Sequence, residues 1–137
     1  MESFLTRDAI DPAAVSRGLA TAADGALGTF VGIVRDNQDG RRVRHLEYEA
    51  HEPMAEAQLQ RLVDGARSRW EVGDIAIRHR LGRLDIGDVS VVVAVAAAHR
   101  APAMEACRWL IDTLKAEVPI FKKEFYADGE AWVEESR

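Results

Sequence analysis

The segment covering residues 99–124 holds the side chains of this sequence that could bind an anion or act as amines. It reads HRAPAMEACRWLIDTLKAEVPIFKKE. His99 and Arg100 begin a predicted helix, Lys115 lies at its end, and Lys122 follows in a predicted strand after a proline. The whole chain has a formal net charge of -5. A local cluster of cations in an acidic chain indicates a site for an anionic ligand or for lysine chemistry.

Lys115 and Lys122 are the candidates for catalysis. The helix macrodipole favours a lysine in the last turn, so Lys115 also fits a purely structural capping role. Catalysis needs a partly desolvated amine, because a lowered pKa lets it act as a nucleophile or proton carrier near neutral pH. Lys122 and Lys123 are adjacent in a strand, so their side chains point to opposite faces. Only one of them can share a pocket with Lys115.

His99 and Arg100 lie at the junction of a buried strand and a helix. Such a junction exposes backbone N–H groups at the positive end of the helix dipole, and an arginine there can bind phosphate through two hydrogen bonds. The pair therefore fits an anion site. The alternative is a polar pair that only satisfies the start of the helix.

A second group of arginines surrounds the polar loop 36–42. Arg35 ends the strand before this loop, and Arg41, Arg42 and Arg44 follow. They fit either a solvated loop and strand edge or a mobile flap that closes over an anion.

Several other side chains have mainly structural interpretations. Glu47 and Glu49 share one face of a strand, as an acid/base pair or as surface and salt-bridge residues. Cys107 is the one cysteine, which excludes an internal disulfide and CxxC motifs, and its place on an apolar helical stripe favours buried packing. The histidines lack metal-ligand spacing, and the sequence has no P-loop, GxSxG or GxGxxG motif. We expect no metal site and no cofactor.

The elements that must position these residues follow from hydrophobic periodicity. The order of strands and helices predicts an α+β domain with helices packed on a mostly antiparallel sheet. The first two long strands are expected to pair antiparallel, and the glycines of the first indicate bulges or a close backbone approach. The apolar run VSVVVAVAAA is expected to be covered on both faces. Strands are predicted at 3–6, 26–35, 43–51, 74–82, 89–98, 120–127 and 130–135, and helices at 12–23, 54–70 and 100–115.

Length and composition narrow the class of protein. The 137 residues predict a single domain, residues 1–137, with a core of its own. The pI near 5.4 argues against nonspecific binding to nucleic acid. No apolar run reaches the roughly 20 residues of a membrane span, and the first residues lack the pattern of a secretory signal. We therefore expect a cytoplasmic protein without nucleic-acid or membrane partners.

Three stretches of the chain closely resemble the catalytic (large) subunit family of molybdopterin synthase. They are FVGIVRDNQDGRRVRHLEYEAHEPMA, IRHRLGRLDIGDVSVVVAVAAAHRAPAMEACRWLIDTLKAEVPIFKKE and DGEAWVE. The resemblance extends from about Gly25 to Trp132. The motifs FxGxVR, LEYEA, HRxGxLxxG, AHR and LKxxxPIFKKE are specific as a set, although each is weak alone.

The resemblance implies an α/β hammerhead fold and a homodimer of large subunits. It also implies a small ubiquitin-like subunit at each end, which makes a heterotetramer. This carrier inserts its C-terminal Gly-Gly tail into the large subunit's pocket and supplies sulfur from a thiocarboxylate. Two sulfurs are added to cyclic pyranopterin monophosphate, giving the dithiolene of molybdopterin. A phosphate-bearing substrate agrees with the cationic segment.

The resemblance also implies roles for the two lysines of LKxxxPIFKKE. Lys115 is expected to contact the carrier's C-terminal carbonyl and to be open to acylation by it. Lys122 is expected to carry protons or to stabilise charge. The family often has tryptophan where this chain has Phe121, and apolar bulk is kept.

Substrate binding is implied for five further residues. His99 and Arg100 match the AHR motif and are expected to bind the substrate anion across the dimer interface. Phe30 and Arg35 match FxGxVR, with Arg35 at the pocket edge. A family arginine beyond the WVE segment aligns with a serine here, and Arg137, which follows it, is the candidate replacement.

Two other functions remain open at this stage. One is a non-catalytic binding protein of the same fold that holds a carrier protein or a phosphorylated ligand. The other is a lysine-dependent acyl or Schiff-base enzyme unrelated to molybdenum. Dependence on a thiocarboxylated partner separates the synthase from both, because a stand-alone enzyme would turn over without it.

Overall fold

The structure is a computed structural model that describes the backbone of residues 3–133 and the side chains of residues 3–130. Among the strand pairs of this part, β1–β5 is parallel and the others are antiparallel, which confirms the predicted α+β class. The elements are β1 (Leu5–Thr6), α1 (Pro12–Ser16), β2 (Ala26–Ile33), β3 (Asn37–Gln38), β4 (Arg41–Ala50), α2 (Glu52–Arg69), β5 (Ile75–Arg80), β6 (Gly82–Asp85), β7 (Val89–Ala97), α3 (Arg100–Glu117), β8 (Ile120–Tyr126) and β9 (Gly129–Val133).

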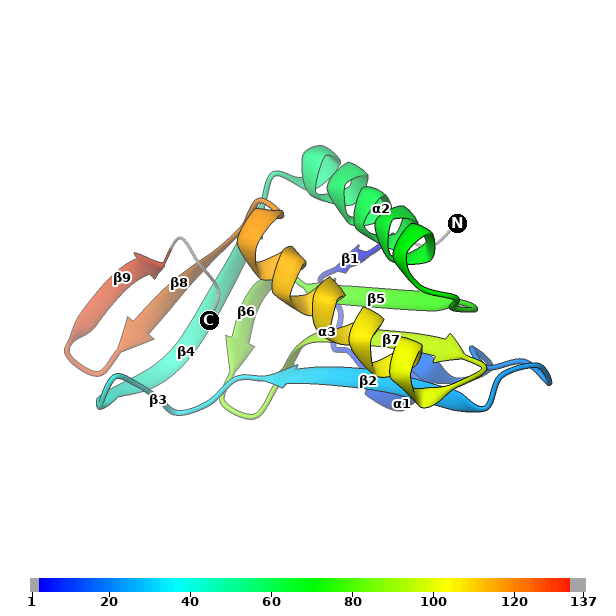
Figure 1. The fold of residues 1–137 in the computed structure, drawn as a ribbon. Helices are drawn as coiled ribbons and strands as arrows, with labels where there is room; N and C mark the ends of the chain where they lie inside the picture. Colours follow the sequence, from blue (N-terminus) through cyan, green and yellow to red (C-terminus); the bar gives the residue numbers. More distant parts are fainter. Residues whose placement is uncertain (1–2, 134–137) are drawn as a thin grey trace.

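The first sheet has the strand order β1-β5-β7-β2. Helices α2 and α3 pack on one of its faces, and α1 lies on the other (Figure 1). Residues 90–97 of β7 are all buried, which confirms that this strand is covered on both sides. None of the helices in the described residues is both long and apolar enough to cross a bilayer.

Two glycines of β2 have the structural roles that the sequence indicated. A Cβ added at Gly28 would lie 2.7 Å from the carbonyl oxygen of Ala103, so glycine lets α3 approach β2 closely. The register of β2 on β7 shifts between Gly32 and Ile33, which is the expected bulge.

The second sheet has the order β3-β4-β8-β9, with β6 also paired to β4. The prediction that the strand at 43–51 pairs with the strand at 26–35 is therefore wrong. The predicted loop 36–42 instead contains a hairpin, because Asp39 and Gly40 adopt positive φ values of 51° and 79° and turn β3 onto β4. Val34 ends β2 by bonding through its N–H to Asp88, and the chain then leaves the first sheet.

Two further boundaries differ from the predictions, each at a glycine. Helix α1 was expected to extend to residue 23 but ends at Ser16, and Gly18 follows with a φ of 74°. The strand expected at 74–82 ends at Arg80, because Gly82 has a φ of 89°. The chain bends there and forms β6, which the sequence did not predict as a separate strand.

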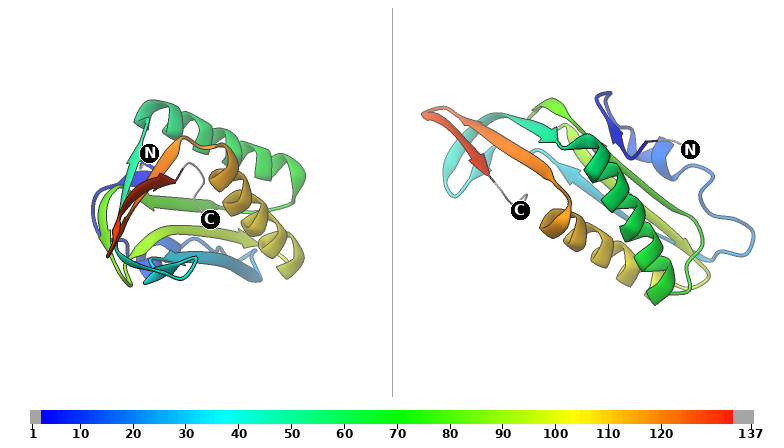
Figure 2. Two further views of the ribbon diagram at one scale, coloured as in Figure 1. Left: turned by 90° about the vertical axis from the view of Figure 1, so that its left-hand side faces the viewer. Right: turned by 90° about the horizontal axis from the view of Figure 1, so that it is seen from above.

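Helix α3 connects the two sheets. Its buried face includes Cys107, as predicted, and burial raises the pKa of this thiol to about 11. The second sheet lies beyond the C-terminal end of α3, so that this end faces β4 and β8 (Figure 2). The helix thereby places its last turn, with Lys115, where the two sheets meet.

Candidate active site

A pocket of about 320 Å³ lies at this meeting point, and we call it the lysine pocket. Its walls come from β2 and the following loop, from β4, from the start of β7, from α3 and from β8. The lining residues are residues 30–35, Asn37, Gln38, Val43, Leu46, Tyr48, Ser90, Lys115, Lys122 and Glu124.

Lys115 and Lys122 enter the pocket from two elements joined by a short connection. Helix α3 ends where the N–H of Val118 bonds to the carbonyl of Leu114 at 3.1 Å, and Pro119 prevents its continuation. Strand β8 starts immediately afterwards, and Lys122 is its third residue. Because strand side chains alternate, Lys122 points inward and is only 5% exposed.

Both amines have a lowered pKa. The pKa of Lys115 is lowered first by burial, then by the charges of Lys122 and Arg35. The pKa of Lys122 is lowered by burial and by Arg35, while Glu124 opposes this shift. Desolvated cations held close together are a common feature of catalytic sites, because they hold an amine ready to lose or accept a proton.

Lys122 has a buried counter-ion in the same strand. Its Nζ lies 4.0 Å from Oε1 of Glu124, which is 2% exposed. In the sheet register, Lys122 is directly opposite Tyr48 of β4, another lining residue. Sequence reasoning missed both Tyr48 and Glu124 as pocket residues. The available signal was strand alternation, since residues two apart in β8 share a face.

Lys123 occupies the opposite face of β8, as the alternation requires. Its Nζ lies 3.1 Å from the carboxylate of Glu130 and 5.1 Å from the ring centroid of Phe125. Lys123 is not among the residues that line the lysine pocket.

Phe30 and Arg35 both line the pocket, on the side of β2 and its following loop. Arg35 is exposed, and its Nη2 donates to Oε1 of Gln38 at 2.7 Å. The hairpin formed by β3 and β4 thus holds the guanidinium at the rim. From this place Arg35 lowers the pKa values of both Lys115 and Lys122.

His99 and Arg100 lie at the other end of α3 and are exposed. Fifteen residues of helix separate Arg100 from Lys115, which is about 22 Å. A single copy of the chain therefore does not bring the His-Arg pair to the lysine pocket. Arg137, the third anion candidate, lies outside the described residues.

The remaining sequence candidates lie away from the pocket. Arg41 donates to Asp128 at 2.8 Å and stacks over the Tyr126 ring at 3.6 Å, which joins its hairpin to the β8–β9 turn. Glu49 is exposed and lies 3.9 Å from the guanidinium of Arg7, in agreement with a surface role. Among the described residues, no group of three His, Cys, Asp or Glu side chains could hold a metal ion.

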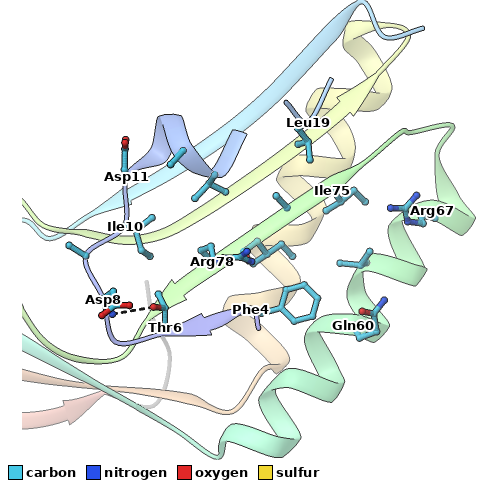
Figure 3. Close-up of a pocket in the computed structure, with 16 residues that line it drawn as sticks. Phe4, Thr6, Asp8, Ile10, Asp11, Leu19, Gln60, Arg67, Ile75 and Arg78 are labelled. Atoms are coloured by element: carbon cyan, nitrogen blue, oxygen red, sulfur yellow. Dashed lines mark hydrogen bonds between the residues drawn. The ribbon is translucent and has the colours of Figure 1, made fainter. Parts of the chain in front are cut away.

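A larger groove of about 680 Å³ lies between the N-terminal segment, β5 and α2 (Figure 3), and we call it the N-terminal groove. Its walls are mainly apolar, with charges of both signs from Asp8, Asp11, Arg67 and Arg78. Its lining contains no lysine, histidine or cysteine. The groove offers space without a buried amine or imidazole, so the lysine pocket is the better candidate for catalysis.

Comparison with known proteins gives matches over most of the chain. The family model described as MoaE protein matches residues 5–117. The molybdopterin synthase catalytic subunit of Arabidopsis thaliana is 49% identical over 112 residues, which are 82% of this chain and 57% of the plant protein. The chain thus spans less than two thirds of that relative's length.

Solved structures agree with the sequence matches. A molybdopterin synthase structure from Staphylococcus aureus has a TM-score of 0.91 at 34% identity, covering 97% of this chain and 98% of that one. A complex of subunits 1 and 2 of molybdopterin-converting factor from Helicobacter pylori has a TM-score of 0.68 at 24% identity. It covers 82% of this chain and 73% of that one, and it supports the fold alone.

Proposed function

Since the chain belongs to the MoaE protein family, we propose that it is the catalytic subunit of a molybdopterin synthase. The reaction is a sulfur transfer. A small ubiquitin-like carrier supplies sulfur from its C-terminal thiocarboxylate, and cyclic pyranopterin monophosphate receives two sulfurs to become the dithiolene of molybdopterin. The chain requires no cofactor of its own for this role.

The observation that carries the proposal is the pair of desolvated amines in the lysine pocket. Lys115 and Lys122 come from different elements, and each has a pKa lowered by burial. Burying two cations together is unfavourable for stability, so a scaffold has no need of it. A transferase gains an amine that can be neutral near neutral pH.

The two lysines have different partners and therefore different roles. Every cause that shifts the pKa of Lys115 lowers it, whereas Glu124 acts to raise the pKa of Lys122, so we assign Lys115 as the amine that loses its proton. It contacts the carrier's terminal carbonyl and can be acylated there. Lys122 keeps its charge through Glu124 and stabilises negative charge, or returns a proton, as sulfur is transferred.

The substrate phosphate binds at the rim of the pocket. Arg35 supplies one cation from the same chain, and Phe30 supplies an apolar wall for the pterin. His99 and Arg100 reach this site only from a second copy, because they lie about 22 Å away in their own chain. Arg137 is a further candidate for the phosphate.

A homodimer of this chain supports that arrangement. Leu27, Ile33 and Met104 are 43%, 60% and 65% exposed, and they lie on β2 and the neighbouring helix α3. Strand β2 also ends the first sheet in the described part of the chain. Exposed apolar side chains beside a sheet edge are suited to contact with a second copy.

The carrier completes a heterotetramer with one small subunit at each end. The Helicobacter pylori structure is described as a complex of two subunits of molybdopterin-converting factor. By analogy, the carrier's Gly-Gly tail enters the lysine pocket of this chain. We place the reaction in the cytoplasm, where the carrier and the pterin would meet.

The test measures product formation from cyclic pyranopterin monophosphate, with and without a thiocarboxylated carrier. Wild type should form the dithiolene only when the carrier is present, and Lys115→Ala should form none while still binding the carrier. Lys123→Ala is the matched control and should retain activity, because Lys123 faces the other side of β8. Absence of product with a competent carrier would contradict the proposed function and favour a binding protein of the same fold.

A further inference from the structure

His79 is a buried histidine for which the reaction described above has no role. It lies on β5 and is 2% exposed. Its sheet neighbours are apolar, with Val91 of β7 on one side and Leu5 of β1 on the other. A fully buried imidazole is uncommon unless its polar atoms have defined partners.

One ring nitrogen of His79 has a partner that fixes its proton. Nδ1 lies 2.9 Å from the carbonyl oxygen of Arg80. A carbonyl oxygen only accepts, so Nδ1 must carry the hydrogen. In the neutral ring, Nε2 is then unprotonated and is an acceptor on the side of the ring away from this carbonyl.

The ring is neutral at physiological pH. Burial lowers the pKa of His79 to about 4, against the raising effect of the Arg80 carbonyl. The positive charge of Lys115 lowers it further. The charge of Lys115 therefore acts on the imidazole.

Tyr48 connects His79 to the lysine pocket. The two rings meet edge to face, with centroids 4.8 Å apart and planes inclined at 76°. Tyr48 is 4% exposed, lines the pocket and is directly opposite Lys122 in the sheet register. Lys115 on α3 and Tyr48 on β4 are thus two ionisable groups that act on His79 or contact it from outside its own sheet.

We propose that His79 is a positioning residue of the lysine pocket. Its imidazole, fixed by the Arg80 carbonyl, supports Tyr48 and presents Nε2 as a neutral acceptor on the side of Lys115. A neutral acceptor orients the amine without adding a third positive charge to Lys115 and Lys122. This role rests on the proposed sulfur transfer, because it assumes that Lys115 must be held for reaction with the carrier.

The first test reads the tautomer of His79 in the wild-type protein by ¹⁵N NMR, without carrier or substrate. We expect the Nδ1–H form and an Nε2 that stays unprotonated throughout the neutral range. Detection of the Nε2–H tautomer, or a titration near the ordinary histidine pKa, would overturn the proposal. This measurement stands even if the sulfur-transfer reaction proves different.

The second test compares His79→Phe with His79→Gln. Phenylalanine keeps an aromatic ring against Tyr48 but removes the acceptor, whereas glutamine restores a donor and an acceptor. We expect His79→Phe to lower kcat about 10- to 100-fold through misplacement of the amine, with carrier affinity unchanged, and His79→Gln to recover part of the loss. His45→Phe is the matched control, since His45 stacks on Phe125 with centroids 4.2 Å apart, outside the lysine pocket.

A readout independent of turnover is the pH dependence of Lys115 acylation by acetic anhydride, followed by peptide mass spectrometry. Loss of the acceptor should move the midpoint for Lys115 to lower pH in His79→Phe and leave that of Lys123 unchanged. An unchanged Lys115 midpoint, or equal loss of activity in His79→Phe and His79→Gln, would assign His79 a purely structural role. Wild type that forms no product would contradict the proposed function, while the Lys115 midpoints would still decide the role of His79.

Discussion

The lysine pocket is smaller than the N-terminal groove, yet it is the better candidate for catalysis. The groove is the larger, about 680 Å³ against about 320 Å³. Its charged residues, such as Asp8 and Arg67, come in both signs and lie on a mainly apolar surface. The smaller pocket gathers Lys115, Lys122 and Arg35, and two of these cations are pushed toward neutrality. The comparison teaches that desolvated like charges locate the chemistry better than volume does.

The largest expected effect comes from Lys115→Met. Loss of the amine should lower carrier-dependent product formation about 100- to 10,000-fold, which is the usual contribution of a proton-transferring group. Methionine keeps the length of the side chain and removes a cation that burial and Lys122 disfavour, so the melting temperature should not fall. Activity and thermal unfolding are measured side by side with Lys123→Met. Equal activity of the two variants would contradict the catalytic role of Lys115.

The next effect concerns stability at acid pH. His79 has a pKa of about 4 when folded and about 6.5 when unfolded, so the unfolded chain binds more protons between these values. This contribution is complete above pH 6.5 and is lost as the pH falls through 4. It amounts to about 3 kcal/mol, since each pKa unit corresponds to about 1.4 kcal/mol.

Urea unfolding of wild type and His79→Phe from pH 7 to pH 4 measures this dependence. The variant should lose less stability over the range than wild type does. Identical slopes would show that the acid sensitivity arises elsewhere and would contradict the lowered pKa of His79.

Arg100→Ala sharpens the comparison in a different way, because this residue lines neither cavity in its own chain. If a second copy delivers Arg100 to the lysine pocket, the variant should raise KM for the pterin substrate about tenfold or more, the worth of one hydrogen bond to a charged group. Carrier affinity should stay the same. Arg108→Ala on the same helix, where Arg108 pairs with Asp112 at 2.8 Å, is the control. Equal loss of substrate and carrier binding would contradict the anion-site role.

The smallest effect is expected in the N-terminal groove. Arg67→Ala removes a lining cation on α2 without touching any residue of the lysine pocket. Turnover should change by less than about twofold, as usual for surface substitutions away from special features. A larger loss in kcat, with folding intact, would give the groove a part in the reaction.

The sequence was sufficient to predict the fold class and the elements around the pocket, because periodicity and proline breaks are local signals. It did not predict the pairing of β4, since partner choice depends on the Asp39-Gly40 turn and on where β2 ends. It also missed β6, which a single positive φ at Gly82 separates from β5. Glycine conformations of this kind are decided by tertiary contacts that no short pattern contains.

For the site, the sequence predicted which residue types matter better than how they are arranged. It named Lys115, Lys122 and Arg35, which the structure gathers in one pocket. It grouped Arg100 with them because they are close in sequence, whereas a helix separates them by about 22 Å. Glu124 was overlooked, because the sequence alone does not show how deeply β8 is buried and therefore does not reveal a buried ion pair.

The most direct test of the central claim is to map where the carrier's C-terminus reacts. The chain has three lysines, Lys115, Lys122 and Lys123, so the products are easily separated. A carrier bearing a C-terminal thioester acylates an amine and releases its thiol, and peptide mass spectrometry locates the new amide bond. The account requires the Gly-Gly remnant mainly on Lys115, with little on Lys123. A remnant on Lys123, or one distributed equally over all three lysines, would contradict the lysine pocket as the site of sulfur transfer.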